Sequence, residues 1–406
     1  MRPTTLAILL CLATALSACA GAQKTSGSAP SEVVDLDPML VRPGAGPDES
    51  IDVNDLFDRA YRAFGNRMYE DATRDYETIV RYFPKSRFYL PSLYNAGLAY
   101  EKLERWDQAA RVYRTIVTEF PGKDDTTDAF YRLAVALEAL QEHQSIVDLM
   151  TEVLLRPNIN TFDRVEAHVR RANALLALAD YNGAVDGFRN ALIINDRAVP
   201  EEKLAPDAHF VVQSYFGIGR AHHHMVAAIP LVLPPERMGA DLQKKAELFM
   251  TAQVNYIRAL GRHHPQWSMA AGYMIGRLYE DFYRDIFTAE IPDDLTEQHL
   301  SLYFEELRKQ LRPLMERAVQ VYEKNLSLSK RIVRKDGNEW VAETEKHLGR
   351  LKAYLDDPVT QQRAERFVLN GRDFTLMWEP LGFAQDGVSV GLRAAQDATR
   401  SSEPQK

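Results

Sequence analysis

One spacing pattern recurs along the chain and constrains its fold more than any other feature. Ala72, Tyr76, Ile79 and Pro84 follow the order Ala-x3-aromatic-x2-apolar-x4-Pro. The same order returns without a gap at Ala109, Tyr113, Ile116 and Pro121. Residues four apart share one face of a helix, and proline ends a helix because it cannot donate the next backbone hydrogen bond. The pattern therefore predicts helical hairpins that pack against copies of themselves.

Weaker copies continue the pattern, with Ile146 and Ala184 in the place of the first alanine. The intervals counted from Ala72 are 37, 37 and 38 residues, and the next two, which end at Ala252 and Ala318, are 68 and 66. Each long interval fits either two cryptic repeats or one repeat with an insertion. We favour the insertion, because prolines interrupt the chain within 230–235.

The run Leu93-x2-Ala96-Gly97-x2-Tyr100 precedes the second copy. With this run included, the pattern resembles the tetratricopeptide repeat. The resemblance implies an all-α fold, a right-handed helical solenoid of the tetratricopeptide (TPR) type with long insertions in its second half. It implies regular repeats over 51–198 and degenerate, longer hairpins over 199–358, where a helix that opens at Asn338 caps the stack.

The first residues resemble the signal of a bacterial lipoprotein. A positive start is followed by a short apolar run, Leu6 to Leu12, and then by Leu16-Ser17-Ala18-Cys19. The apolar run is too short to span a bilayer, as is typical of a secretory signal. The resemblance implies that residues 1–18 are removed and that Cys19 carries diacylglycerol and a further acyl chain such as palmitate. It implies no cofactor besides this covalent lipid, and an ordinary signal peptide is the alternative.

Residues 19–50 join the lipid site to the repeats. They are rich in Ser, Gly, Ala, Pro and Asp, a composition that predicts a disordered tether. Ala20 follows the lipid site, where lipoproteins held at the inner membrane often carry Asp. By this resemblance the protein is anchored in outer-membrane lipid through the Cys19 acyl chains and faces the periplasm.

The charge and the motifs argue against nucleic-acid binding and catalysis. The net charge is −8 and no basic cluster interrupts it, so nucleic acid is not an expected partner. Residues 387–391 read G-x-S-x-G, but they lack the strand and helix that a nucleophile elbow requires. The histidines at 222–224 and 263–264 do not have the i, i+4 spacing of helical metal ligands, and His222 is predicted to pack in the core. We therefore predict no enzyme activity and no metal site.

The C-terminal region has a different character from the helical body. Within 359–383, the stretch from Phe367 to Leu376 predicts a small hairpin that turns at Asn370-Gly371. Residues 384–406 are polar and are predicted to be a disordered tail.

A partner-binding groove is the expected functional site. The resemblance implies that the first helix of each hairpin lines a concave surface. One equivalent position per hairpin holds Phe57, Tyr94, Tyr131, Val169, Phe216 and Tyr273. Aromatic rings suit the capture of a peptide or helix, and the alternative is that they pack between repeats. Polar residues beside the later rings are candidates for selectivity: Arg220, His223, Arg277 and Glu280.

The combined features predict a non-catalytic outer-membrane lipoprotein that binds other envelope proteins through its groove. It resembles the repeat lipoproteins of gliding-motility and pilus machines, and also the lipoprotein of β-barrel assembly. The long second half departs from the compact assembly lipoprotein, so we favour a trans-envelope machine such as gliding motility. A part in β-barrel assembly and an accessory role that recruits or binds peptidoglycan and its enzymes are the alternatives.

Overall fold

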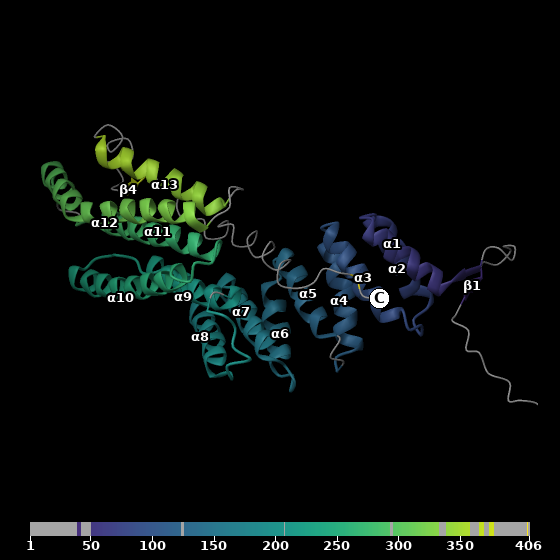
Figure 1. The fold of residues 1–406 in the computed structure, drawn as a ribbon. Helices are drawn as coiled ribbons and strands as arrows, with labels where there is room; N and C mark the ends of the chain where they lie inside the picture. The colour runs from purple at the N-terminus through teal and green to yellow at the C-terminus, as the bar shows by residue number, and fades with distance from the viewer. Residues whose placement is uncertain are drawn as a thin grey trace, which may run out of the picture.

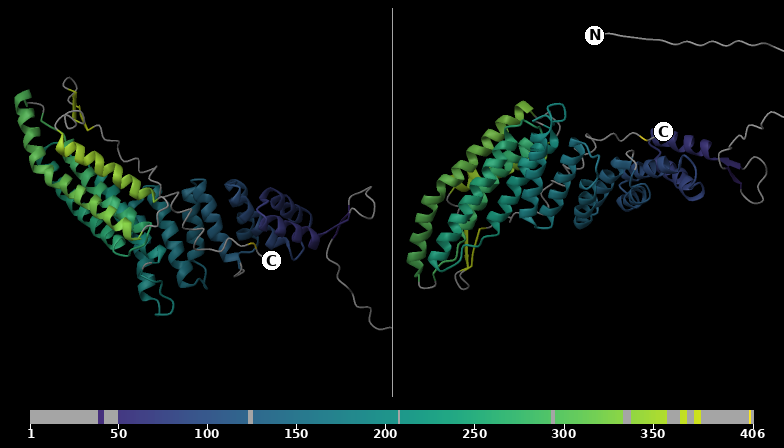
Figure 2. Two further views of the ribbon diagram at one scale, coloured as in Figure 1. Left: turned by 45° about the horizontal axis from the view of Figure 1, so that its top comes forward. Right: turned by 90° about the horizontal axis from the view of Figure 1, so that it is seen from below.

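The computed structural model consists of helices stacked in chain order from one end of the molecule to the other (Figure 1). It describes residues 39–41, 50–122, 126–206, 208–292, 295–332, 338–357, 365–368, 373–376 and 404. Figure 2 shows an elongated, gently curved body with the shorter helices at one end and the longest at the other. Among the helices of the described residues, none has the length and apolarity needed to cross a membrane.

The first eight helices form four hairpins of similar size. Their bounds are α1 Val53–Gly65, α2 Tyr69–Tyr82, α3 Tyr89–Lys102, α4 Trp106–Glu119, α5 Thr127–Ala139, α6 His143–Leu154, α7 Thr161–Ala177 and α8 Tyr181–Arg197. Each helix packs mainly on its two neighbours in sequence. The predicted stack of hairpins is therefore confirmed in this half.

The same turn joins the two helices of all four hairpins. Four residues that are not glycine adopt a left-handed backbone, with φ between 56° and 62°: Arg67, Glu104, Gln141 and Ala179. In each case the next residue donates its N–H to the carbonyl five residues earlier, as Met68 does to Ala63 at 2.8 Å. This hydrogen-bond pattern is the Schellman motif that closes helix C-termini.

The second half contains longer helices. Their bounds are α9 His209–Ala227, α10 Pro235–Leu260, α11 Trp267–Phe287, α12 Glu297–Ile332 and α13 Glu339–Asp356. Each long interval in the sequence contains one hairpin, as the insertion hypothesis predicts. The added length lies largely in α10 and α12, which have 26 and 36 residues, besides the proline-containing connection before α10.

A final helix covers the end of the stack. The helix begins where the sequence indicated, and the side chain of Asn338 accepts the N–H of Trp340 at 3.0 Å and so caps α13. Trp340 is buried against Tyr273 of α11, with ring centroids 5.6 Å apart. The helix therefore closes an apolar face that α11 and α12 would otherwise expose.

Two short antiparallel pairs flank the helices. Strand β1 (Met39–Val41) pairs with β2 (Ser50–Asp52), so the prediction of a disordered tether is wrong for residues 39–41 and 50. The apolar triad of β1 is joined to β2 by a segment rich in Pro and Gly, a composition that favours chain reversal. Strand β3 (Glu365–Val368) pairs with β4 (Asp373–Leu376), which confirms the predicted hairpin. Cys19, the segment 387–391 and Asn370-Gly371 lie outside the described residues.

Candidate interaction surfaces

The rings expected to line a groove are buried. Six residues occupy the equivalent place in α1, α3, α5, α7, α9 and α11, and each is at most 5% exposed: Phe57, Tyr94, Tyr131, Val169, Phe216 and Tyr273. The prediction that they line an open groove is wrong, and the alternative of packing between helices is correct. A partner could not contact these rings without displacing the helices that cover them.

Packing within each hairpin explains this burial. In four hairpins the aromatic residue of the first helix contacts a tyrosine of the second, with centroid distances from 5.7 to 6.1 Å: Phe57–Tyr76, Tyr94–Tyr113, Phe216–Tyr256 and Tyr273–Tyr322. The hydroxyl groups then reach beyond the hairpin. The Tyr131 hydroxyl donates to the carbonyl of Asp163 in α7 at 2.7 Å, and the Tyr94 hydroxyl donates to the Asp128 carboxylate in α5. These tyrosines therefore hold neighbouring hairpins together.

A glycine opposite the second tyrosine makes this close packing possible. A Cβ placed on Gly97 would lie 2.4 Å from the Tyr113 ring, and one on Gly276 would lie 2.1 Å from the Tyr322 ring. Four residues after each glycine, Glu101 and Glu280 accept the hydroxyl of the same tyrosine. Gly219, Tyr256 and His223 repeat the arrangement, with His223 Nδ1 3.4 Å from the hydroxyl. We did not predict this Gly-x3-polar signal, although it is readable in the sequence.

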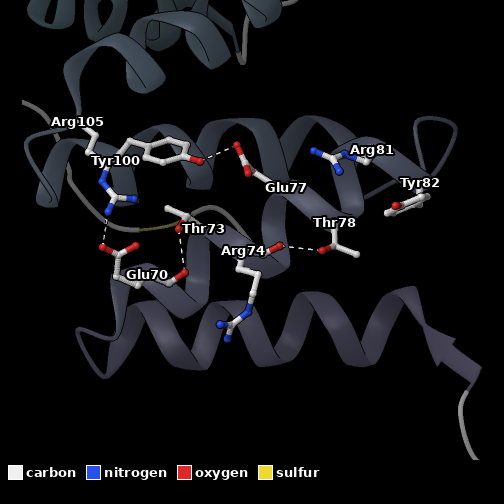
Figure 3. A pocket seen from close by; sticks show the side chains of 9 residues that line it. All are labelled: Glu70, Thr73, Arg74, Glu77, Thr78, Arg81, Tyr82, Tyr100 and Arg105. Carbon is white, nitrogen blue, oxygen red and sulfur yellow. Dashed lines mark hydrogen bonds and ion pairs between the residues drawn. The ribbon is translucent and has the colours of Figure 1, made fainter.

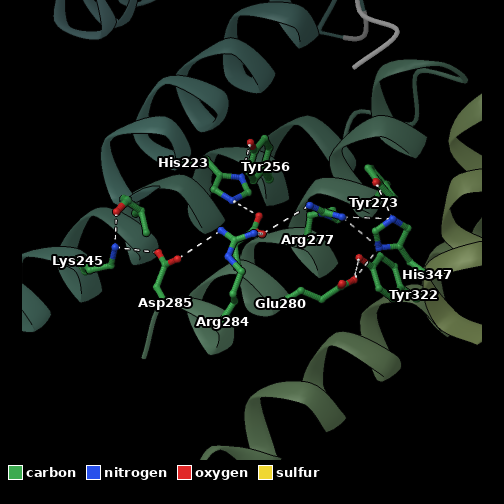
Figure 4. A network of polar contacts seen from close by, with 12 residues as sticks. His223, Lys245, Tyr256, Tyr273, Arg277, Glu280, Arg284, Asp285, Tyr322 and His347 are labelled. Carbon is green, nitrogen blue, oxygen red and sulfur yellow. Dashed lines mark hydrogen bonds and ion pairs between the residues drawn. The ribbon is translucent and has the colours of Figure 1, made fainter. Parts of the chain in front are cut away.

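Glu280 is the centre of a buried polar cluster that joins α11 to α12 and α13 (Figure 4). Its carboxylate accepts from His347 Nδ1 at 2.9 Å and from the Tyr322 hydroxyl at 2.5 Å. Arg350 donates to the second oxygen at 2.5 Å. Burial would raise the pKa of Glu280, but the His347 hydrogen bond and the nearby cationic groups of Arg277 and Arg350 hold this pKa below its usual value.

Asp281 extends the cluster to α9. Its carboxylate lies 3.1 Å from His223 Nε2, 2.9 Å from Arg284 and 3.5 Å from Arg277. Burial would raise the pKa of Asp281, but the charge of Arg277 and the His223 hydrogen bond lower it overall. Three of the residues predicted to give partner selectivity instead connect helices inside the protein: His223, Arg277 and Glu280. The fourth, Arg220, is half-buried.

The adjacent histidines have separate environments. His222 Nδ1 lies 2.8 Å from the carbonyl of Ile218 and the side chain is buried, as predicted. His224 instead stacks on Tyr181, with centroids 5.1 Å apart. In the described part of the chain, no three His, Cys, Asp or Glu side chains gather in a group that could hold a metal ion.

Hollows on the second-helix side are open to solvent, and two of them differ sharply in their lining. The first, of about 390 Å³, lies over α2 and is lined mostly by charged residues (Figure 3). Most of its charged groups pair with a neighbour: Arg105 lies 2.6 Å from Glu70, and Arg111 lies 2.9 Å from Glu77. The Tyr100 hydroxyl also donates to Glu77 at 2.6 Å. Because these groups already have partners, this hollow offers little to a ligand.

The second hollow, of about 460 Å³, lies between α8 and α10 over α9. Apolar side chains contribute much of its lining, including Leu192, Tyr215, Met250 and Val254. Met250 is 57% exposed and Val254 46% exposed. This is the surface where an apolar partner could dock without displacing a helix.

Comparison with known proteins agrees with the repeat architecture. A model of the tetratricopeptide repeat family matches residues 92–123. This stretch is similar to one tetratricopeptide repeat. It contains most of α3 and all of α4, the copy that ends at Pro121. Repeats of this kind typically serve as non-catalytic scaffolds that bind other proteins.

Several solved structures match parts of the chain at low identity and low TM-score. The crystal structure of MamA protein is 14% identical, with 50% of this chain and 91% of that chain covered and a TM-score of 0.35. A tetratricopeptide repeat protein from Parabacteroides merdae is 12% identical, with coverage of 72% and 98% and a TM-score of 0.36. A TPR repeats protein from Bacteroides fragilis is 13% identical, with coverage of 74% and 98% and a TM-score of 0.25. Among curated proteins, none matches the chain significantly.

Proposed function

We propose that this chain is a non-catalytic scaffold, lipid-anchored at the outer membrane, that holds other envelope proteins together in a trans-envelope machine such as gliding motility. The observation that supports the scaffold role is the succession of packed helices from α1 to α13, which leaves a long solvent-exposed surface while the rings at equivalent positions lie inside it. Such stacks provide extended binding surfaces. The lipoprotein-like signal that ends at Cys19 supports the membrane anchor.

The anchor is tested by metabolic labelling with an alkyne analogue of palmitate in a bacterial host. We expect the full chain to take up the label and to fractionate with the outer membrane. Cys19→Ser should abolish both results, whereas Cys11→Ser should leave both unchanged because Cys11 lies in the segment that is removed. Label that persists in Cys19→Ser would contradict lipidation at this residue.

The machine is tested by deleting the gene in the native host and assaying motility, surface appendages and the abundance of β-barrel proteins. We expect loss of surface motility with normal barrel levels. Normal motility with reduced barrel levels would instead favour β-barrel assembly. Binding of the purified full chain to isolated sacculi, with no other protein present, would favour the peptidoglycan alternative.

A further inference from the structure

A row of apolar side chains runs along the exposed face of α10. Met250, Val254 and Ile257 follow the i, i+4, i+7 spacing of one helix face and are 57%, 46% and 51% exposed. The opposite face of the same helix buries Phe249 and Tyr256 in the core. Single exposed apolar residues are ordinary, but a contiguous row beside a hollow is typical of an interaction site.

The hollow beside this row gives a partner a place to insert side chains. Leu192 of α8 forms one wall, and Tyr215 and Ile218 of α9 lie between that wall and α10. Ile193, next to Leu192, is also 43% exposed. The corresponding hollow over α2 is lined mostly by charged residues, so the apolar lining at α8–α10 is not imposed by the repeat.

The border of the hollow is basic, although the chain as a whole is acidic. Arg189 and Arg258 line it, and in the described part of the chain neither forms an ion pair with a carboxylate. The guanidinium groups of Arg258 and Arg262 lie 5.9 and 5.3 Å from the centroid of the Tyr215 ring. Glu247 is the carboxylate among the lining residues. The border therefore attracts negative charge, in a chain whose net charge is −8.

We propose that the α8–α10 surface, defined by Leu192, Tyr215, Met250, Val254, Ile257 and Arg258, binds an acidic amphipathic helix of a partner protein. The inference rests on the proposed scaffold role. A helix is the fitting occupant because rows of side chains spaced i, i+4 pack into the grooves between such rows on another helix. Carboxylates on its flanks would form charge-assisted hydrogen bonds with the unpaired arginines.

Binding of designed peptides to the purified full chain tests this chemistry. The probe is a fluorescein-labelled 18-residue helix of Leu, Ala and Glu, about five turns long, with Leu at helical spacing. One control peptide replaces Glu by Lys, and another scrambles the order. We expect the acidic amphipathic peptide to bind at least about tenfold more tightly than either control, since charge and apolar face must both match. Equal binding of all three, or none, would overturn the proposal.

Variants of the exposed row assign the binding to this surface. Met250→Glu with Val254→Glu should weaken the acidic peptide by at least about tenfold, and Arg258→Glu should weaken it and reduce its salt dependence. The control is Tyr82→Glu on α2, whose side chain is 53% exposed, and it should leave binding unchanged. Circular dichroism melts should show all variants folded, because the altered side chains are on the surface. Unchanged affinity in the α10 variants would place the peptide elsewhere and overturn the assignment.

Photo-crosslinking in the native host identifies the occupant. A benzophenone amino acid is placed in the full chain at Val254, and at Tyr82 as control. We expect crosslinked peptides from another protein that are acidic and have apolar residues at i, i+3 or i, i+4 spacing. Crosslinks to a second copy of this chain, to lipid, or to partners that lack this pattern would overturn the proposal. Palmitate labelling at Cys19 is measured in a separate experiment. Loss of the proposed peptide-binding role of the α8–α10 surface would therefore leave the lipid anchor untouched, and loss of the anchor would leave the surface untouched.

Discussion

The two halves of the solenoid hold their helices together in different ways. In α1–α8 the ties join adjacent hairpins, as in the buried pair Glu101–Arg132, whose members are 31 residues apart. In α9–α13 one cluster spans five helices, and its contacts join residues up to 74 apart, as in His223–Asp281 at 58 and Tyr273–His347 at 74. A repeat of constant length needs only local ties. Long helices of unequal length are held by contacts between residues that are far apart in the sequence.

The largest expected loss of stability comes from removing Glu280, and comparison with Glu101 distinguishes the contacts of the two halves. Glu280→Ala should lower the free energy of unfolding by about 3–5 kcal/mol, because it leaves buried cationic partners without their carboxylate. The matched change Glu101→Ala should cost less, since Arg132 keeps Asp128 at 3.4 Å. Urea denaturation gives the free energies, and hydrogen exchange should show the Glu280→Ala loss confined to α9–α13. Equal losses in both variants would contradict the distinction between the halves.

Replacing glycine by alanine should test the glycine–tyrosine contact that occurs in each half of the solenoid. Gly276→Ala should destabilise the chain by about 1–3 kcal/mol, because the new methyl group would overlap the Tyr322 ring. Gly97→Ala should have a similar effect through Tyr113. Gly349→Ala is the control: it has open space around it and should stabilise α13 by up to about 1 kcal/mol. Thermal or urea unfolding measures all three, and a neutral Gly276→Ala would show that this contact is loose.

Lowering the pH should weaken the second half through His209. Burial, followed by the charges of His264 and Arg170, lowers the pKa of His209 from 6.5 to about 3. Its Nδ1 accepts the indole N–H of Trp267 at 3.0 Å, which requires a neutral ring. Because the folded-state pKa lies below the unfolded one, this contribution is complete above pH 6.5 and is lost as the pH falls towards about 3.

Urea unfolding at pH 7 and pH 5 measures this effect. We expect a loss of up to about 1.4 kcal/mol per pH unit below pH 6.5 from this residue. His209→Gln retains an acceptor for Trp267 and does not titrate, so it should reduce the slope, while His168 and His224, whose pKa values are also lowered by burial, keep contributing. An unchanged slope in His209→Gln would show that the residue is not the source.

The smallest effect concerns the turns of the regular half. Ala179→Gly should stabilise the chain by about 0.5–1 kcal/mol, since φ is 62° and a β-carbon is unfavourable there. Ala177→Gly, two residues earlier on the exposed end of α7, should instead cost up to about 1 kcal/mol. Opposite signs in denaturation experiments would verify the turn geometry, and losses in both variants would contradict it.

The sequence predicted features that depend on nearby residues and left open those that depend on distant ones. Ala109, Tyr113 and Pro121 lie where the pattern indicated, because spacing on one helix face determines local packing. The start of the last helix at Asn338 was readable for the same reason. The aromatic residues were recognised as a set, but the choice between groove and core stayed open, since tyrosine serves equally in both. Only the neighbouring helices decide which surface remains open.

The sequence by itself determined the helical hairpins and their order, because helix periodicity and proline act over a few residues. It also determined the chemistry of Glu280 and His347 as single residues, but not that they meet, since they are 67 residues apart. The tertiary structure decided which side chains became internal ties and which, on α10, stayed on the surface. Burial depends on how long helices of unequal length pack together, and that packing is a property of the assembled chain rather than of any segment.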